Sequence, residues 1–395
     1  MRDMDDRGEL TGIALAGRAG HWDLRHEGGR ITALRPSQKG GGGFVTPLLA
    51  DIHTHLDKTF TAARMPHRAG SLFDAIEMMA RDAEGWTEDD LRSRAGRALG
   101  KAYHHGTALM RSHVDWNDAQ APLAWQVLCG LAEDWRGRIG LQLASLTPLD
   151  RLVEIGSSVA AQIRDSGGIL GAFVYRNADL AAKIGTVFDL AERYGLDLDF
   201  HVDEGLDPDA RGIDAIIGET ARRGMAGRVL CGHGCALSIR DSQEVAGILD
   251  RASEAGIGLT VLPGANSYLQ DAAPGRTPRL RGLAPLREAQ EAGVPVMIGS
   301  DNVRDGFFPY GDYDLGDMFR LAVLAGHLPP DEWLDSISER PANWMGHSLR
   351  LTEGGPASFI RIAAEDAGDA ISRSRAARAI WRDGKVLPEL QGEQQ

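Results

Sequence analysis

The sequence predicts an α/β protein, a (β/α)8 barrel of the TIM type that carries a small β-sandwich built from the N- and C-terminal segments. Between residues 46 and 346, short apolar segments alternate with longer amphipathic ones, which indicates parallel strands joined by crossover helices. The short apolar segments number eight, the count that closes such a barrel. The length of 395 residues suits a barrel of roughly 250 residues with an attached domain.

The individual elements follow from this alternation. The strand candidates are residues 48–53, 108–114, 140–146, 169–174, 196–201, 229–233, 258–262 and 294–298. Amphipathic helices are expected between them, among others at 72–83, 89–104, 184–194, 214–223, 238–255 and 283–292. A doubly wound open sheet is the competing architecture, but it requires a glycine-rich phosphate-binding fingerprint that is not found in the sequence.

Both ends of the chain carry short apolar runs of another kind. Runs at 11–16, 22–24 and 31–34 are broken by glycine and polar pairs, and similar runs return at 357–362, 379–381 and 385–387. This rhythm is typical of short antiparallel strands, and the glycines at 40–43 indicate a flexible joint. We expect one β-sandwich domain from residues 1–46 and 349–395, and the barrel domain from 47–348.

Charge and cysteine content restrict the class of protein. With 43 basic and 56 acidic residues the net charge is −13, so neither nucleic acid nor an anionic membrane is expected as a partner. Cys129, Cys231 and Cys235 are too few for a disulfide framework, which suits a reducing compartment. The first ten residues are charged where a signal peptide needs an apolar run, and no window reaches the roughly 18 apolar residues of a membrane span. We therefore expect a cytoplasmic enzyme.

A His-x-His motif ends the first predicted strand. Side chains alternate along a strand, so His53 and His55 point to the same side, as a pair of metal ligands must. Alone, this string is short and common. The ends of later strands add further metal-binding and proton-carrying residue types, namely His113, His201, Glu204, His233 and Asp301. Because a barrel keeps its chemistry at the C-terminal ends of its strands, we expect these groups to lie on one face.

A metal centre accounts for most of these residues. Three imidazoles and a carboxylate suit Zn, Fe or Mn, and we assign His53, His55, His201 and Asp301 as the ligands. Such a metal lowers the pKa of a bound water towards about 7 and makes it a nucleophile.

Two strand-end residues are left over for proton transfer. Glu204 is not needed as a ligand and is free to carry protons, and His233 is placed to hydrogen-bond the water. The alternatives for these two positions are an ordinary solvated Glu and a packed core His.

The strand-end motifs resemble the amidohydrolase superfamily, and within it the cytosine deaminase-like branch that also contains N-isopropylammelide hydrolase. The matching segments are HTHLDKTF (53–60), RSHVDW (111–116), LQLAS (141–145), HVDEG (201–205), GHG (232–234) and GSDNVRDGFFPYG (299–311). The resemblance spans nearly the whole chain. It implies a barrel with a β-sandwich, one divalent metal ion, and hydrolytic removal of an amine from a small nitrogen heterocycle.

The resemblance also implies roles for single residues. His53, His55, His201 and Asp301 match the metal ligands of the family, and Glu204 matches the acid that protonates the ring nitrogen. His233 and Asp301 match the pair that orients and deprotonates the attacking water, after which Asp301 passes the proton to the departing amine. Strand four, residues 169–174, contains no lysine that could be carbamylated to bridge two metals, so one metal is expected.

The predicted substrate pocket departs from the cytosine deaminases. The position of their substrate-reading Gln falls at Pro148, beside Leu149, and neither side chain can form hydrogen bonds with a carbonyl and ring nitrogen edge. Asn302 and Lys58 agree instead with the triazine enzyme, and Phe307 takes the place of a Trp that walls the ring. Lys58 could otherwise be an ordinary salt-bridged lysine.

The sequence thus predicts a metal-dependent hydrolytic deaminase whose substrate is a small heterocycle. The alternatives are an N-alkylaminohydrolase acting on an s-triazine such as N-isopropylammelide, a cyclic amide hydrolase, and a non-catalytic metal-dependent binding protein on the same fold. The zinc cytidine-deaminase class and the Ser-His-Asp hydrolases are disfavoured, because their Pro-Cys-x-x-Cys and Gly-x-Ser-x-Gly motifs do not occur. The resemblance allows a homo-oligomer without indicating an interface.

Overall fold

Eight parallel strands form the barrel of the protein. The computed structural model describes residues 7–373 and 375–388 and places the strands in the order β12-β11-β10-β9-β8-β7-β6-β5. Their bounds are β5 Leu49–Thr54, β6 Thr107–Asp115, β7 Gly140–Pro148, β8 Leu170–Val174, β9 Leu198–Val202, β10 Val229–His233, β11 Gly258–Val261 and β12 Val296–Ile298. A parallel bridge between Thr54 and Asp301 joins β5 to the end of β12 and nearly closes the ring. The predicted barrel is confirmed.

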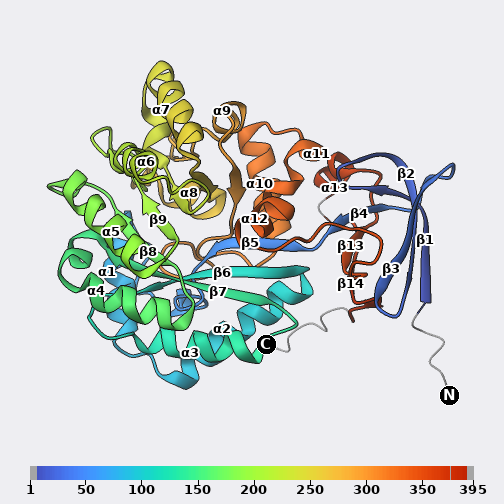
Figure 1. Ribbon diagram of the computed structural model, residues 1–395, viewed down its shortest axis with the longest axis horizontal. Coiled ribbons are helices and arrows are strands. Elements are labelled where there is room, and N and C mark those ends of the chain that lie inside the picture. The colour runs from blue at the N-terminus through green and yellow to red at the C-terminus, as the bar shows by residue number, and fades with distance from the viewer. Residues whose placement is uncertain (1–6, 374, 389–395) are drawn as a thin grey trace. The chain divides into compact units, whose positions relative to one another are not determined.

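Helices follow the strands and surround them (Figure 1). They are α1 Leu72–Ala83, α2 Glu88–His104, α3 Leu123–Asp134, α4 Leu149–Ser166, α5 Leu180–Tyr194, α6 Gly212–Arg223, α7 Ser242–Ala255, α8 Pro263–Leu269 and α9 Leu286–Glu291, with the 3-10 turns η1 Ala62–Arg64 and η2 Cys235–Ile239. Four consecutive helices, α4 to α7, end on glycines whose positive φ angles of 64–70° stop the helix in a left-handed cap (Gly167, Gly195, Gly224, Gly256). These sequence-encoded stops let the chain turn into the next strand.

The helix from 238 to 255 is shorter than predicted. It begins only at Ser242, because Asp241 acts as its N-cap and accepts hydrogen bonds from the backbone nitrogens of Gln243 and Glu244 at 2.9 and 3.4 Å. Residues before this cap form the separate turn η2. The predicted range for α1, by contrast, agrees with its observed bounds.

The two ends of the chain meet in a second, curled sheet. It contains β1 Arg7–Leu15, β2 Arg18–Glu27, β3 Arg30–Ser37, β4 Phe44–Pro47, β13 Phe359–Ile362, β14 Arg378–Arg382 and β15 Lys385–Val386. The order β15-β14-β13-β4-β1-β2-β3 makes it a mixed sheet, since β1 and β4 are parallel and the other pairs are antiparallel. Its buried core includes Leu24, Val45 and Phe359, so both chain ends contribute. The predicted pairing of the two ends is confirmed.

The chain divides into two units of dense internal contact. One holds the described residues of Met1–Ala50, Gly100–Ala108 and Leu315–Gln395, including α10 Leu315–Gly326, α11 Pro330–Trp333, η3 Leu334–Ile337, α12 Glu339–Trp344 and α13 Ala367–Ser372. The other holds Asp51–Leu99 and Leu109–Asp314 and contains the residues of the site described below. The domain boundaries at residues 46 and 349 stay a prediction. Among the described residues, no helix has both the length and the apolar character needed to cross a membrane.

Candidate active site

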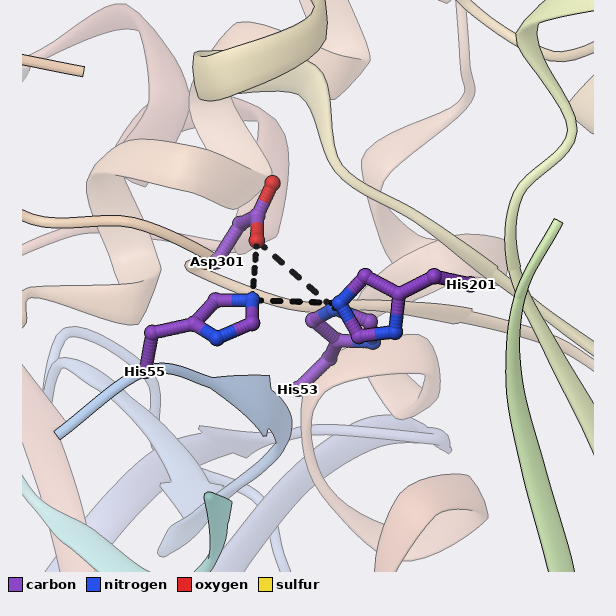
Figure 2. Close-up of side chains that lie close together, drawn as sticks. All are labelled: His53, His55, His201 and Asp301. Carbon is purple, nitrogen blue, oxygen red and sulfur yellow. Dashed lines mark hydrogen bonds and ion pairs between the residues drawn. The ribbon is translucent and has the colours of Figure 1, made fainter. Parts of the chain in front are cut away.

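Four buried side chains converge at the C-terminal end of the barrel strands. The Nε2 atom of His201 lies 3.1 Å from that of His53 and 3.2 Å from that of His55, and Oδ1 of Asp301 lies 3.2 Å from His55 Nε2 (Figure 2). The His53 to Asp301 distance is 3.6 Å. The structure thus brings together the four residues predicted as metal ligands, in a group that could hold a metal ion.

The backbone positions these ligands from three strands. His53 lies in β5 and His201 in β9, His55 directly follows β5, and Asp301 lies three residues after the end of β12. The nitrogen of Asp301 donates to the carbonyl of His53 at 2.8 Å, and Asp301 adopts a φ of +59°, a left-handed conformation that is uncommon for a residue with a side chain. Asp51 supports this turn, since its carboxylate accepts bonds from the nitrogen and hydroxyl of Ser300 at 3.0 and 2.5 Å. Backbone strain of this kind often occurs at functional sites.

The electrostatics of this cluster suit a cation. Burial, together with neighbouring cationic and imidazole groups, lowers the pKa values of His53, His55 and His201 well below the usual value, so that all three are neutral imidazoles with lone pairs to donate. Burial and the nearby Glu204 raise the pKa of Asp301. Neither carboxylate oxygen of Asp301 has a hydrogen-bond donor within the part of the chain that the structure describes. A divalent ion would relieve the cost of this buried, unpaired carboxylate.

Glu204 and His233 lie beside the cluster. Oε1 of Glu204 is 3.6 Å from Nδ1 of His233, and both side chains are buried. Burial raises the pKa of Glu204 to about 8 and lowers that of His233 to about 3. At neutral pH Glu204 therefore retains a proton that it can donate, whereas His233 is uncharged.

Two amide side chains that the sequence did not reveal contact these residues, namely Asn266 in helix α8 and Gln270, the C-cap of that helix. Asn266 places its amide nitrogen 3.0 Å from Nδ1 of His233, and the Gln270 side chain donates to the backbone carbonyl of Glu204 at 2.6 Å. Both side chains are at least nine-tenths buried. The available signal was the i, i+4 spacing of two amides shortly after the seventh predicted strand, 258–262.

Lys58 is buried next to the four-residue cluster. Its Nζ donates to Oδ1 of Asp115 at 2.7 Å and lies 3.2 Å from Nδ1 of His55 and 5.8 Å from the ring centre of Phe307. Burial disfavours the charge, but Asp115 and Asp57 outweigh this effect and raise the pKa of Lys58. Lys58 is therefore both salt-bridged and directed towards the site.

Asp305 organises two of the predicted pocket residues. It accepts a bond from the side-chain nitrogen of Asn302 at 2.6 Å and from the backbone nitrogens of Phe307 and Phe308 at 2.9 and 3.0 Å. Burial raises its own pKa to about 6. The loop after β12 thus takes its shape from an aspartate that the sequence analysis did not single out.

A cavity of about 370 Å³ adjoins the cluster. It lies within the roughly 300–1,000 Å³ typical of small-molecule sites. Its walls include the predicted residues His55, Lys58, Pro148, His201, Glu204, His233, Asn302 and Phe307. Apolar side chains from outside the predicted set complete it, namely Met79, Trp86, Leu123 and Phe173 among others. The predicted substrate-binding residues therefore face one space together with Glu204 and His233, while their roles stay predictions.

A second buried cluster shares His53 with the first. His53, His113 and Asp199 also lie close enough to hold an ion, with His113 Nε2 3.3 Å from Oδ1 of Asp199. Here, however, the Arg111 guanidinium donates to the other oxygen of Asp199 at 2.7 Å. Since Arg111 already neutralises that carboxylate, a further cation is disfavoured at this point.

Fold and site together define a (β/α)8-barrel protein with a candidate metal centre, and comparisons with known proteins identify its family. A profile of the amidohydrolase family matches residues 161–388. The pterin deaminase of Rhizobium rhizogenes (strain K84 / ATCC BAA-868) is 38% identical over 352 residues, which cover 87% of this chain and 80% of the relative. The chain therefore belongs to the amidohydrolase family.

Two further relatives are more distant. The N-isopropylammelide isopropyl amidohydrolase of Pseudomonas sp. (strain ADP) is 24% identical, over 72% of this chain and 68% of the relative. The structure of 5-methylcytosine deaminase from Klebsiella pneumoniae liganded with 5-fluorocytosine superposes with a TM-score of 0.84 at 24% identity, and covers 98% of both chains. That likeness confirms the fold. Two predictions are confirmed. The protein belongs to a metal-dependent family, and it is a hydrolase of carbon–nitrogen bonds in the class of hydrolytic deaminases.

Proposed function

We propose that the protein removes an amine hydrolytically from a ring carbon of a pterin-like heterocycle, and that it uses one divalent metal ion. The observation that carries this proposal is the meeting of the four-residue cluster, a protonated Glu204 and a cavity of about 370 Å³ at one face of the barrel. A binding protein needs no proton carrier beside its metal, so catalysis is favoured over the non-catalytic alternative.

The metal is proposed to be Zn, Fe or Mn, held by His53, His55, His201 and Asp301. When bound, it would act as a Lewis acid that activates water. Two observations support a single ion. Strand β8, with the sequence LGAFV, offers no lysine to bridge two metals, and Arg111 pairs the carboxylate of the second cluster.

The surrounding residues are proposed to move the protons. Glu204 carries a proton on its carboxyl group and delivers it to a ring nitrogen, which makes the adjacent carbon electrophilic. His233 orients the attacking water, and Asp301 provides the carboxylate oxygen that accepts the proton of that water and passes it to the departing amine. Burial of all three groups strengthens these interactions.

A pterin-like substrate is supported by the relative at 38% identity, whose name states the deamination of pterin. The pocket agrees with this choice. Pro148, which lines the cavity, supplies no hydrogen-bond donor, so the edge recognition expected for cytosine is missing. Aromatic walls from Trp86, Phe173 and Phe307 suit a flat ring system.

Ammonia release from a panel of heterocycles tests the proposal. The panel contains pterin, cytosine, isocytosine and N-isopropylammelide, with a cyclic amide whose opening releases no amine. We expect ammonia from pterin with a kcat/KM at least about tenfold above that for the single rings. Isopropylamine from N-isopropylammelide alone would favour the triazine alternative, and ring opening without amine release would favour the cyclic amide hydrolase. Turnover of none of these compounds by metal-loaded protein would contradict the proposed function. The compartment and a homo-oligomeric state, which the sequence analysis left as expectations, stay predictions.

A further inference from the structure

The hydrogen bond between Asn266 and His233 carries information about the position of a proton. His233 is the last residue of β10 and has a φ of +71°, and its imidazole is buried. Its Nδ1 has the amide nitrogen of Asn266 at 3.0 Å, whereas its Nε2 has no hydrogen-bond partner within the described chain. Glu204, at 3.6 Å from Nδ1, is too far away for a hydrogen bond.

A neutral imidazole has one N–H and one lone pair, so the partner at one nitrogen determines the state of the other. An amide NH2 group only donates. If Asn266 donates to Nδ1, that atom holds the lone pair and the proton sits on Nε2.

The surroundings of Asn266 favour this orientation of its amide. The amide oxygen, as placed, has no donor within the described chain. In the reversed orientation a buried NH2 group would occupy that position and would need an acceptor there. Buried N–H groups without acceptors are rarer than carbonyl oxygens without donors.

We propose that Asn266 is a positioning residue that holds His233 as the Nε2–H tautomer, so that His233 acts in the reaction as a hydrogen-bond donor and not as a base. The part of this inference that concerns the reaction rests on the proposed function. The part that concerns the tautomer does not. The family resemblance implies that His233 and Asp301 together orient and deprotonate the water, whereas this proposal gives the two residues different roles. His233 donates from Nε2 to the oxygen of the attacking water or of the developing tetrahedral carbon centre, and Asp301 alone accepts the proton of the water.

Two substitutions at position 266 test the proposal by their order. Asn266→Ala removes the donor and lets both tautomers form, so kcat should fall about tenfold. Asn266→Asp has nearly the same shape and, when it is ionised above its own pKa, presents only acceptor oxygens, which favours the proton on Nδ1 and leaves Nε2 without one. We expect kcat to fall by about 10²- to 10³-fold, with metal content and thermal unfolding close to those of the unsubstituted protein.

A kcat that decreases from the unsubstituted protein to Asn266→Ala and then to Asn266→Asp is therefore diagnostic. A purely structural role gives the opposite order for the two variants, because Asp preserves the shape of Asn better than Ala does. An Asp variant within threefold of the unsubstituted protein would overturn the proposal. So would an Asp variant that is more active than the Ala variant.

Substitution of His233 provides a matched comparison. His233→Gln keeps an N–H donor that reaches towards the same space but cannot accept a proton, whereas His233→Ala has neither capacity. We expect the Gln variant to be at least tenfold more active than the Ala variant, and equal activities would contradict a donor role.

A spectroscopic test does not depend on turnover. In the metal-loaded protein labelled with ¹⁵N-histidine, the ring nitrogens of His233, assigned by comparison with His233→Gln, should show a protonated Nε2 and an unprotonated Nδ1. The Asn266→Asp variant should show the reverse. If the spectrum agrees but no heterocycle is turned over, the proposed function fails while the tautomer assignment stands. A protonated Nδ1 in the unsubstituted protein refutes the assignment directly.

Discussion

The two buried clusters that share His53 differ in the charge that faces their carboxylate. In the cluster of His53, His55, His201 and Asp301, no cationic side chain of the described chain pairs with the carboxylate oxygens of Asp301. In the cluster of His53, His113 and Asp199, Arg111 donates to Asp199 at 2.7 Å. Both combine buried histidines with one buried carboxylate, so the guanidinium is one feature that distinguishes them. A histidine–carboxylate cluster is a candidate metal site when its own chain leaves the carboxylate without a cation.

Access provides a second difference. The cluster with Asp301 adjoins the cavity through His55 and His201, and Glu204 and His233 line the same space. His113 and Asp199 are fully buried and are not among the residues that line the cavity. The first arrangement suits chemistry on a substrate, and the second suits a structural salt bridge in the barrel interior.

The largest expected effect on turnover concerns the proton carrier beside the first cluster. Glu204→Gln keeps the shape but cannot release a proton, so kcat should fall by about two to four powers of ten with unchanged metal content. Metal analysis alongside steady-state kinetics checks this. Normal turnover would show that Glu204 is not the acid of the reaction. The first cluster would then no longer differ from the second by a neighbouring proton carrier.

Glu204 also predicts a pH dependence. Because burial raises its pKa to about 8, the protonated form that can act as an acid prevails below that pH and is lost above it. The kcat/KM should therefore decline as the pH rises through about 8. This decline should be absent from the residual activity of Glu204→Gln, and an unchanged alkaline limb in that variant would assign the titration to another group.

Gly232 lies against the histidine that both clusters share. A Cβ at this position would come within 2.8 Å of Cε1 and 3.0 Å of Nδ1 of His53, closer than such contacts allow. Gly232→Ala should displace the imidazole and weaken metal affinity by about 10- to 100-fold, as disturbed ligand support commonly does. Competition with a chromophoric chelator measures this, and unchanged affinity would show that His53 is not held as a ligand. Gly247→Ala, where a Cβ meets no atom within 4 Å, is the control.

Substitution of Asp199 tests whether the second cluster is a structural salt bridge and not a metal site. Asp199→Asn leaves Arg111 buried without its counter-ion, and the free energy of unfolding should fall by about 3–5 kcal/mol. The folded variant should still bind about as much metal as the unsubstituted protein. Denaturant unfolding and metal analysis provide both values. Loss of metal with unchanged stability would identify the second cluster as a ligand site and reverse the comparison.

Lys58 is expected to give the smallest effect. Its ammonium group lines the cavity but is already paired with Asp115, so we expect it to give the substrate a charged hydrogen bond without moving protons. Lys58→Met should raise KM about tenfold and leave kcat within threefold. A loss confined to kcat would instead indicate that Lys58 supports His55, whose Nδ1 lies 3.2 Å away.

The parts of the site that the sequence predicted are those fixed by strand order. His53 and His201 lie near the C-terminal ends of strands of one parallel barrel and Asp301 lies just beyond another, and such ends meet on one face whatever the loops do. Asn266 and Asp305 escaped prediction because they act through other residues, from a short helix and a loop whose paths the apolar pattern does not determine.

The pairing of Arg111 with Asp199 could not be predicted from the sequence either. The two residues lie on different strands, 88 positions apart, and only the register of the closed barrel brings them to 2.7 Å. That contact gives a physical reason for leaving His113 out of the predicted ligand set.

Metal content and turnover measured on the same sample test the central claim most directly. The purified protein should contain about one equivalent of Zn, Fe or Mn, and treatment with a chelator should abolish ammonia release from pterin. Addition of one of these ions should restore it. Full activity in the metal-free protein would contradict the assignment of His53, His55, His201 and Asp301 as the catalytic metal centre.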